Sequence, residues 1–119
     1  MRESTLEIHV GEGLDTVAAR FLDGWDRMER CEDVQEKHVS FATWETFVSI
    51  MTPKRLQLLR HVHREPARKI RVLAQAIGRD YRRVHDDVAA LTAAGLLERD
   101  SDGIRADYDA FHAETRVAL

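Results

Sequence analysis

The chain has 119 residues, one cysteine and a formal net charge of −3, which allows a buried core and excludes an internal disulfide framework. It has no apolar run of membrane-spanning length and no basic-then-apolar leader, so with the lone Cys31 it is expected to be cytoplasmic and to have no membrane partner. The net acidity argues against a protein that coats nucleic acid indiscriminately.

Charge is distributed unevenly along the chain. Residues 1–52 hold 5 basic and 11 acidic side chains, residues 53–99 hold 11 basic and 5 acidic, and residues 100–119 hold 2 basic and 5 acidic. This asymmetry favours a basic middle that meets a polyanion and acidic flanks that face elsewhere. The same arginines would also suit solvated helix faces, and charge alone favours neither interpretation.

Residues 1–51 are predicted to form a strand–helix segment. Alternating apolar residues at 6–10 indicate a half-buried strand, and apolar residues at helical spacing over 14–28 indicate an amphipathic helix. A second strand is expected at 38–42, followed by a helix with Thr43 as its N-cap. An aromatic stripe is expected to be core or dimer interface rather than a ligand pocket, and its members are Phe21, Trp25, Trp44 and Phe47.

Residues 52–109 are predicted to form a second domain with three helices. Thr52-Pro53 marks the start of a helix that reaches about residue 63, because threonine caps helices and proline suits the first helical position. A second helix is expected at 70–77 and a third at about 80–94. Glycines are expected to end the last two helices, and the inward residues of the third are Val84, Val88 and Leu91.

The turn between the second and third helices carries a specific pattern. Ala74 would let the two helices cross closely, Gly78 permits a positive φ, and the branched Val84 would lock the third helix onto the second. Apolar residues then flank the turn sequence 100–103, which predicts a hairpin. The order predicts a mostly helical α+β fold: a winged helix-turn-helix at 52–109, an N-terminal extension and a C-terminal strand at 110–119.

Two stretches carry a resemblance to known regulators: Phe41-Ala42-Thr43-Trp44-Glu45-Thr46-Phe47 and Thr52-Pro53-Lys54-Arg55-Leu56-Gln57-Leu58-Leu59. Residues 52–108 resemble the winged helix-turn-helix of MarR- and ArsR-type transcription regulators. The whole chain is similar more narrowly to a family of archaeal and bacterial regulators often found beside small toxin genes. The resemblance implies an antitoxin with a small toxin as partner. The chain lacks the cysteine box of ArsR-type metal sensors, which argues against metal sensing.

The outward face of the third helix carries the expected base-reading residues. Recognition helices place their N-terminal residues against base edges in the major groove, where arginine can grip guanine and aspartate can accept from cytosine. The expected base-reading set is Arg79, Arg82, Arg83 and Asp86. The alternative is that Arg82–Asp86 and Arg83–Asp87 are intrahelical pairs, which are weak in this order. Contacts to phosphate, including one from the hairpin or wing, are expected from Lys54, Arg55, Arg68, Lys69, Arg71 and Arg105.

Catalytic chemistry finds little support in the residues. His61 and His63 are two apart and would point to different sides of a helix, unlike an i,i+4 metal-binding pair. Cys31 lies in an acidic stretch, which makes it a poor nucleophile, and neither a phosphate loop nor a nucleophile elbow is present. We therefore expect no enzyme activity, metal or cofactor.

The sequence thus predicts a transcription regulator, specifically a repressor, that binds double-stranded DNA as a homodimer with the third helix in the major groove. The acidic N-terminal segment is expected to mediate dimerisation, and the C-terminal stretch to add a strand to the sheet or the interface. The alternative is an adaptor or antitoxin that binds a partner protein through its first fifty residues.

Overall fold

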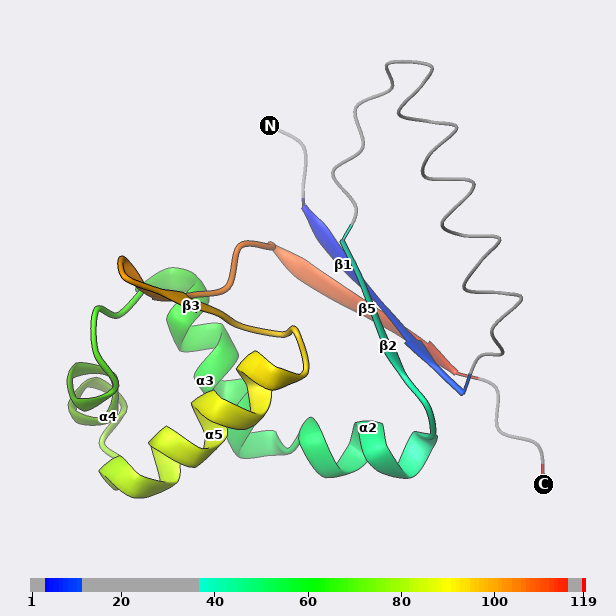
Figure 1. Cartoon of the computed structure of the whole chain (residues 1–119), viewed down its shortest axis with the longest axis horizontal. Coiled ribbons are helices and arrows are strands. Elements are labelled where there is room, and N and C mark those ends of the chain that lie inside the picture. Colours follow the sequence, from blue (N-terminus) through cyan, green and yellow to red (C-terminus); the bar gives the residue numbers. More distant parts are fainter. Residues whose placement is uncertain (1–3, 12–36, 116–118) are drawn as a thin grey trace, which may run out of the picture. The chain divides into compact units, whose positions relative to one another are not determined.

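The computed structural model describes residues 4–11, 37–115 and 119 and shows an α+β fold (Figure 1). The chain divides into two compact units, one formed by residues 48–109 and the other by residues 1–47 together with 110–119. The amphipathic helix predicted at 14–28, with Phe21 and Trp25, and also Cys31 lie outside the described residues. In the described part of the chain, no helix is both long and apolar enough to cross a membrane.

The first unit contains a three-stranded parallel sheet. Its strands are β1 (Thr5–Val10), β2 (Lys37–Phe41) and β5 (Ala110–Thr115), in the order β2-β1-β5. Both neighbours pair with β1 in parallel, and the three arrows run together in Figure 1. The apolar positions of β1 are at most 3% exposed. The predicted strands at 6–10 and 38–42 are confirmed, and the C-terminal stretch does add a strand to the sheet.

Helix α2 (Trp44–Ile50) follows β2 and begins at the predicted cap. The Thr43 hydroxyl accepts a hydrogen bond from the Thr46 backbone N–H at 3.1 Å. Phe47 is buried and meets the ring of Phe41 edge-on, with 5.3 Å between ring centroids. Trp44 remains 43% exposed.

The second unit contains the three predicted helices, α3 (Pro53–Arg64), α4 (Ile70–Ile77) and α5 (Tyr81–Ala93). The Thr52 hydroxyl caps α3 by accepting from the Arg55 N–H at 3.3 Å. The apolar stripes of the helices face one another in the core. Their buried members are Leu58, Leu59, Val62, Ile70, Leu73, Ala74, Val84, Val88 and Leu91.

The turn between α4 and α5 has the backbone that the sequence predicts. Gly78 takes a left-handed φ of 66°, which side chains other than glycine disfavour. Its N–H donates to the Gln75 carbonyl at 3.3 Å, and the Arg79 N–H donates to the Ala74 carbonyl at 3.0 Å. These two bonds satisfy carbonyls at the end of α4 and turn the chain directly into α5.

The predicted hairpin is formed by β3 (Glu98–Asp100) and β4 (Gly103–Arg105), which pair antiparallel. Ile104 also bridges Ala67, in the segment between α3 and α4, through N–H···O bonds of 2.7 and 3.1 Å. A Cβ added to Gly103 would collide with the Ala67 carbonyl oxygen. The hairpin is therefore fixed against the chain that leads into α4.

Candidate nucleic-acid interface

The N-terminal end of α5 presents two arginines to solvent. The Asp80 carboxylate caps the helix by accepting from the Arg83 N–H at 3.3 Å, and Val84 and Val88 are fully buried on the opposite side. Arg82 and Arg83 are exposed. In the described part of the chain neither side chain forms an ion pair, so the alternative pairs with Asp86 and Asp87 do not form.

Asp87 instead binds two arginines from other parts of the second unit. Its carboxylate accepts from Arg55 Nε at 3.0 Å and from an Arg79 terminal nitrogen at 2.8 Å. The Arg55 guanidinium also donates to the carbonyls of Ser49 and Ile50. The side chains of Asp87 and the two arginines are only 14–19% exposed. Arg55 and Arg79, expected to contact phosphate and bases, are thus held inside the protein's own network, which joins the start of α3 to α5.

Asp86, the residue before Asp87, is open to solvent. Its side chain is 70% exposed and approaches His85 Nδ1 at 3.4 Å. The ring of His85 packs at a tilt against Tyr81, with 6.2 Å between centroids. Asp86 is therefore available at the same surface as Arg82, as the sequence predicts.

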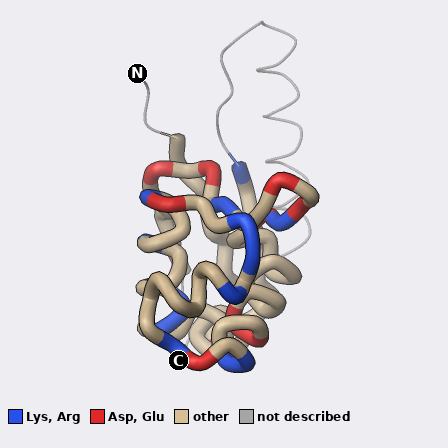
Figure 2. Tube along the Cα trace, turned by 90° about the vertical axis from the view of Figure 1, so that its left-hand side faces the viewer, with Lys and Arg blue, Asp and Glu red and all other residues tan. Residues whose placement is uncertain are grey.

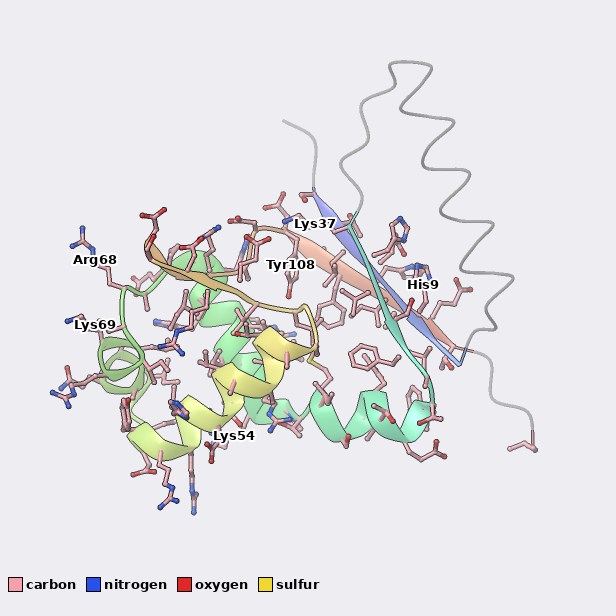
Figure 3. The ribbon with its side chains drawn as sticks, viewed as in Figure 1. His9, Lys37, Lys54, Arg68, Lys69 and Tyr108 are labelled. Atoms are coloured by element: carbon pink, nitrogen blue, oxygen red, sulfur yellow. The ribbon has the colours of Figure 1, made fainter. Side chains whose placement is uncertain are left out.

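A second basic group surrounds the start of α4. Arg68, Lys69 and Arg71 are all exposed, and among the described residues none of them has a carboxylate partner. Figure 2 shows the basic segment that leads into α4 as a continuous blue stretch, and in Figure 3 the side chains of Arg68 and Lys69 point away from the ribbon. Lys69 is the N-cap residue but gives α4 no side-chain cap, so unbonded N–H groups at this helix start add to the attraction for an anion. Lys54, in the first turn of α3, is likewise exposed.

Arg105 lies in the hairpin, as predicted, but its charge is already compensated. Its guanidinium pairs with Glu98 at 3.1 Å, Asp100 at 2.7 Å and Asp107 at 2.9 Å. The hydrogen bond to Asp100 is the main cause that raises the pKa of Arg105, and the same bond lowers the pKa of the Asp100 carboxyl. The arrangement suits a residue that holds the hairpin together better than one that reaches phosphate.

The aromatic residues expected at a dimer interface fall into separate environments. Phe47 is buried within the first unit, so its side chain is core and is not offered to a partner. Trp44 lies 5.8 Å from the Phe47 ring and is partly exposed. Of the four residues, Trp44 alone combines a described position with an exposed side chain.

Two features of the site were not predicted from the sequence. The Asp87 network joins residues 32 positions apart, and no local pattern signals such a pair. Tyr81 is 51% exposed in the first turn of α5, and its place next to Arg82 could have been recognised from the sequence. Among the described residues, no cluster of His, Cys, Asp or Glu is arranged to hold a metal ion.

Comparison with known protein families gives a match to part of the chain. The model of the HVO_A0114 family matches residues 50–113, which includes all three helices of the second unit, the hairpin and part of β5. No curated protein and no solved structure matches the chain. Because the match covers more than half of its length, the chain belongs to the HVO_A0114 family.

Proposed function

We propose that this protein is a cytoplasmic transcription regulator that binds specific double-stranded DNA as a homodimer and represses the genes it binds. Residues 52–109 would act as a winged helix-turn-helix with α5 in the major groove. The proposal is supported by the element order of the second unit, in which three helices precede a hairpin. The bridge between Ala67 and Ile104 supports it further, because it joins the hairpin, the expected wing, to the segment that connects α3 and α4.

The observation that carries the proposal is the exposure of Arg82 and Arg83 at the start of α5, without a partner in the described part of the chain. Two exposed arginines at the first turn of such a helix can each hold guanine O6 and N7 with two parallel hydrogen bonds. Asp86, one turn after Arg82, can accept from the amino group of cytosine. Together they offer a way to read sequence rather than charge alone.

The remaining basic residues would then have two kinds of role. Arg68, Lys69 and Arg71, with Lys54, are suited to phosphate contacts, which position a protein on DNA without reading its sequence. Arg55 and Arg79 would position α5 through Asp87. In this proposal Arg105 holds the hairpin and contributes little to phosphate binding.

The proposal is tested by selecting DNA fragments with the purified full-length protein, followed by affinity measurements over a salt series. We expect an enriched sequence motif and a binding constant for that motif that falls steeply with salt. Selection without an enriched motif, or binding insensitive to salt, would contradict it.

Variants separate the two kinds of contact. Arg82→Ala or Arg83→Ala should cost about 1–3 kcal/mol on the selected sequence and much less on scrambled DNA. Lys69→Ala should weaken both DNAs alike and lower the salt slope by about one per subunit. Arg64→Ala removes an exposed arginine from the C-terminal end of α3. It serves as the matched control and should leave the affinity for both DNAs unchanged. Equal losses on both DNAs for all three interface variants would show that α5 does not read sequence.

A second candidate function is an adaptor or antitoxin whose main role is to bind a partner protein, such as a small toxin. It is favoured by the exposed apolar residues Trp44 and Val48 on α2, which are 43% and 46% exposed. If this function dominates, Trp44→Ser should abolish partner capture and leave DNA affinity unchanged. A protein that binds no DNA but copurifies with the product of a neighbouring gene would place this candidate first.

A further inference from the structure

The outer edge of β5 presents backbone groups that no strand among the described residues uses. β5 pairs with β1 on one side only, and the Ala110 N–H donates to the Ser4 carbonyl at 3.2 Å. Because backbone direction alternates along a strand, His112 and Glu114 also direct their N–H and C=O groups toward β1. Those of Phe111, Ala113 and Thr115 therefore point to the outer edge, where they form a template for another strand.

We propose that this edge binds the same edge of a second copy of the chain, antiparallel, across a two-fold axis that passes beside Ala113. The two three-stranded sheets would join into one sheet of six strands. A two-fold axis in this position puts Ala113 opposite Ala113 of the partner subunit and Phe111 opposite Thr115 of the partner subunit. Each of these residues has outward backbone groups, so every facing pair can exchange two N–H···O bonds.

The side chains of β5 suit this arrangement. The same axis puts His112 opposite Glu114 of the partner subunit, twice, at the closely spaced type of antiparallel pair. Both side chains are exposed, and that of His112 is 60% exposed. Glu7 of the same chain already lies 3.1 Å from His112 Nδ1, so in the dimer this histidine would lie between two carboxylates. The strand is thus complementary in charge to its own reversed copy.

The opposite face of β5 supports the same partner. Phe111 and Ala113 are register neighbours of Leu6 and Ile8, whose side chains are 1% exposed. On β5 itself, Phe111 is half-buried and Ala113 is exposed. Side-chain exposure on this apolar face therefore increases from the central strand β1 to the edge strand β5, as expected where the face reaches an open edge. A second copy would continue this face, and the small alanine side chains would meet at the axis without crowding.

The other edge of the sheet fits a second copy less well. In β2 the outward backbone groups belong to His38 and Ser40 only, because the Phe41 carbonyl accepts from Gly11 and so faces β1. β2 also contains Lys37 and His38 but no acidic residue, so no register about a two-fold axis brings opposite charges together there. The β5 edge is therefore the site we assign to the second copy.

This inference deepens the proposed function by naming the surface that would join the two DNA-binding units. It can fail separately, since oligomeric mass is measured without DNA. The test is the mass of the full chain in solution, at about 50 µM and below, by light scattering and sedimentation. Wild type should have the mass of a dimer, and a monomeric mass at all these concentrations would overturn the proposal.

Proline variants identify the edge. Ala113→Pro removes an N–H that points outward and keeps the bonds to β1, a position where edge strands tolerate proline. It should raise the dimer dissociation constant at least about tenfold, because two intersubunit hydrogen bonds are lost, while circular dichroism stays that of wild type. Ala113→Ser, which keeps the N–H, and Ser40→Pro, on the other edge, should remain dimers. A folded Ala113→Pro dimer, or dissociation by Ser40→Pro alone, would refute the assignment.

A cross-link gives a reading that does not depend on how well a proline variant folds. Facing residues in a hydrogen-bonded antiparallel pair have Cα atoms about 5.5 Å apart, so a short bismaleimide can bridge cysteines placed there. In a Cys31→Ser background, Ala113→Cys should form a covalent dimer with this reagent, and Ser40→Cys should not. No cross-link at position 113, or an equal one at position 40, would contradict the proposed axis.

Discussion

Replacing Asp87 by alanine should destabilise the second unit strongly. The carboxylate accepts from Arg55 at 3.0 Å and Arg79 at 2.8 Å, and all three side chains are at least four-fifths removed from solvent. One nitrogen of Arg79 is already buried without a hydrogen-bond partner. The substitution would leave two guanidinium groups beside the core with no anion. Breaking a fully buried pair costs about 3–5 kcal/mol, and the residual exposure of these groups lowers the expected loss to about 2–4 kcal/mol.

The measurement is the free energy of unfolding in urea, with Asp86→Ala as the matched control. Asp86 is the adjacent residue on the same helix but its side chain is 70% exposed, so its removal should change stability by no more than about 0.5 kcal/mol. If Asp87→Ala is no more destabilising than Asp86→Ala, the network does not fix α5. Arg55 and Arg79 would then return to the set of candidate DNA contacts.

The remaining predictions concern Tyr108 and two glycines. Burial raises the pKa of Tyr108 to about 12 from its usual 10, so the folded state favours the neutral phenol and stability should fall as pH rises from about 10 to 12. Tyr108→Phe loses the 2.8 Å bond to the Leu96 carbonyl and should cost about 0.5–1.5 kcal/mol at neutral pH, and should show a smaller decline at high pH. Gly78→Ala should cost about 1–2 kcal/mol from its positive φ alone. Gly103→Ala should cost clearly more in the same urea assay, because its Cβ also meets the Ala67 backbone; equal losses would contradict this.

Most of the second unit was predictable from the sequence because its signals are local. The Thr52-Pro53 pair fixes the start of α3, and the predicted bounds of α4 agree with the structure at both ends. α5 is confirmed to within one residue at either end. Caps, glycine turns and helical periodicity act over a few residues and can be read without knowing the fold.

The partners of side chains and strands were less predictable, for a physical reason. Alternation identifies β5 as a strand, but its pairing with β1 joins residues about 105 positions apart, and a period of two carries no information about the neighbour. Likewise, an outward position on a helix does not reveal whether a charged side chain from another element forms an ion pair with the residue there. Arg79 lies in such a position in the sequence and proves to be bound by Asp87.

Ion pairing also changes what the charge asymmetry of the sequence means. Residues 53–99 hold 11 basic side chains, but two of them, Arg55 and Arg79, are bound by Asp87. Arg105, which follows this stretch in the sequence, is bound by three carboxylates. The basic side chains left at the starts of α4 and α5 without a partner in the described part of the chain are Arg68, Lys69, Arg71, Arg82 and Arg83. The residues suited to phosphate are Arg68, Lys69 and Arg71 at α4, with Lys54. If only these four contact phosphate, the logarithm of the DNA-binding constant plotted against the logarithm of the salt concentration should have a slope of about −3 to −4 per subunit. All nine basic side chains of residues 53–99 that Asp87 does not bind would together give a slope of about −8 per subunit. A slope clearly steeper than that would require the internally paired arginines to leave their carboxylates on binding, and the Asp87 network would then be a switch rather than a fixed support.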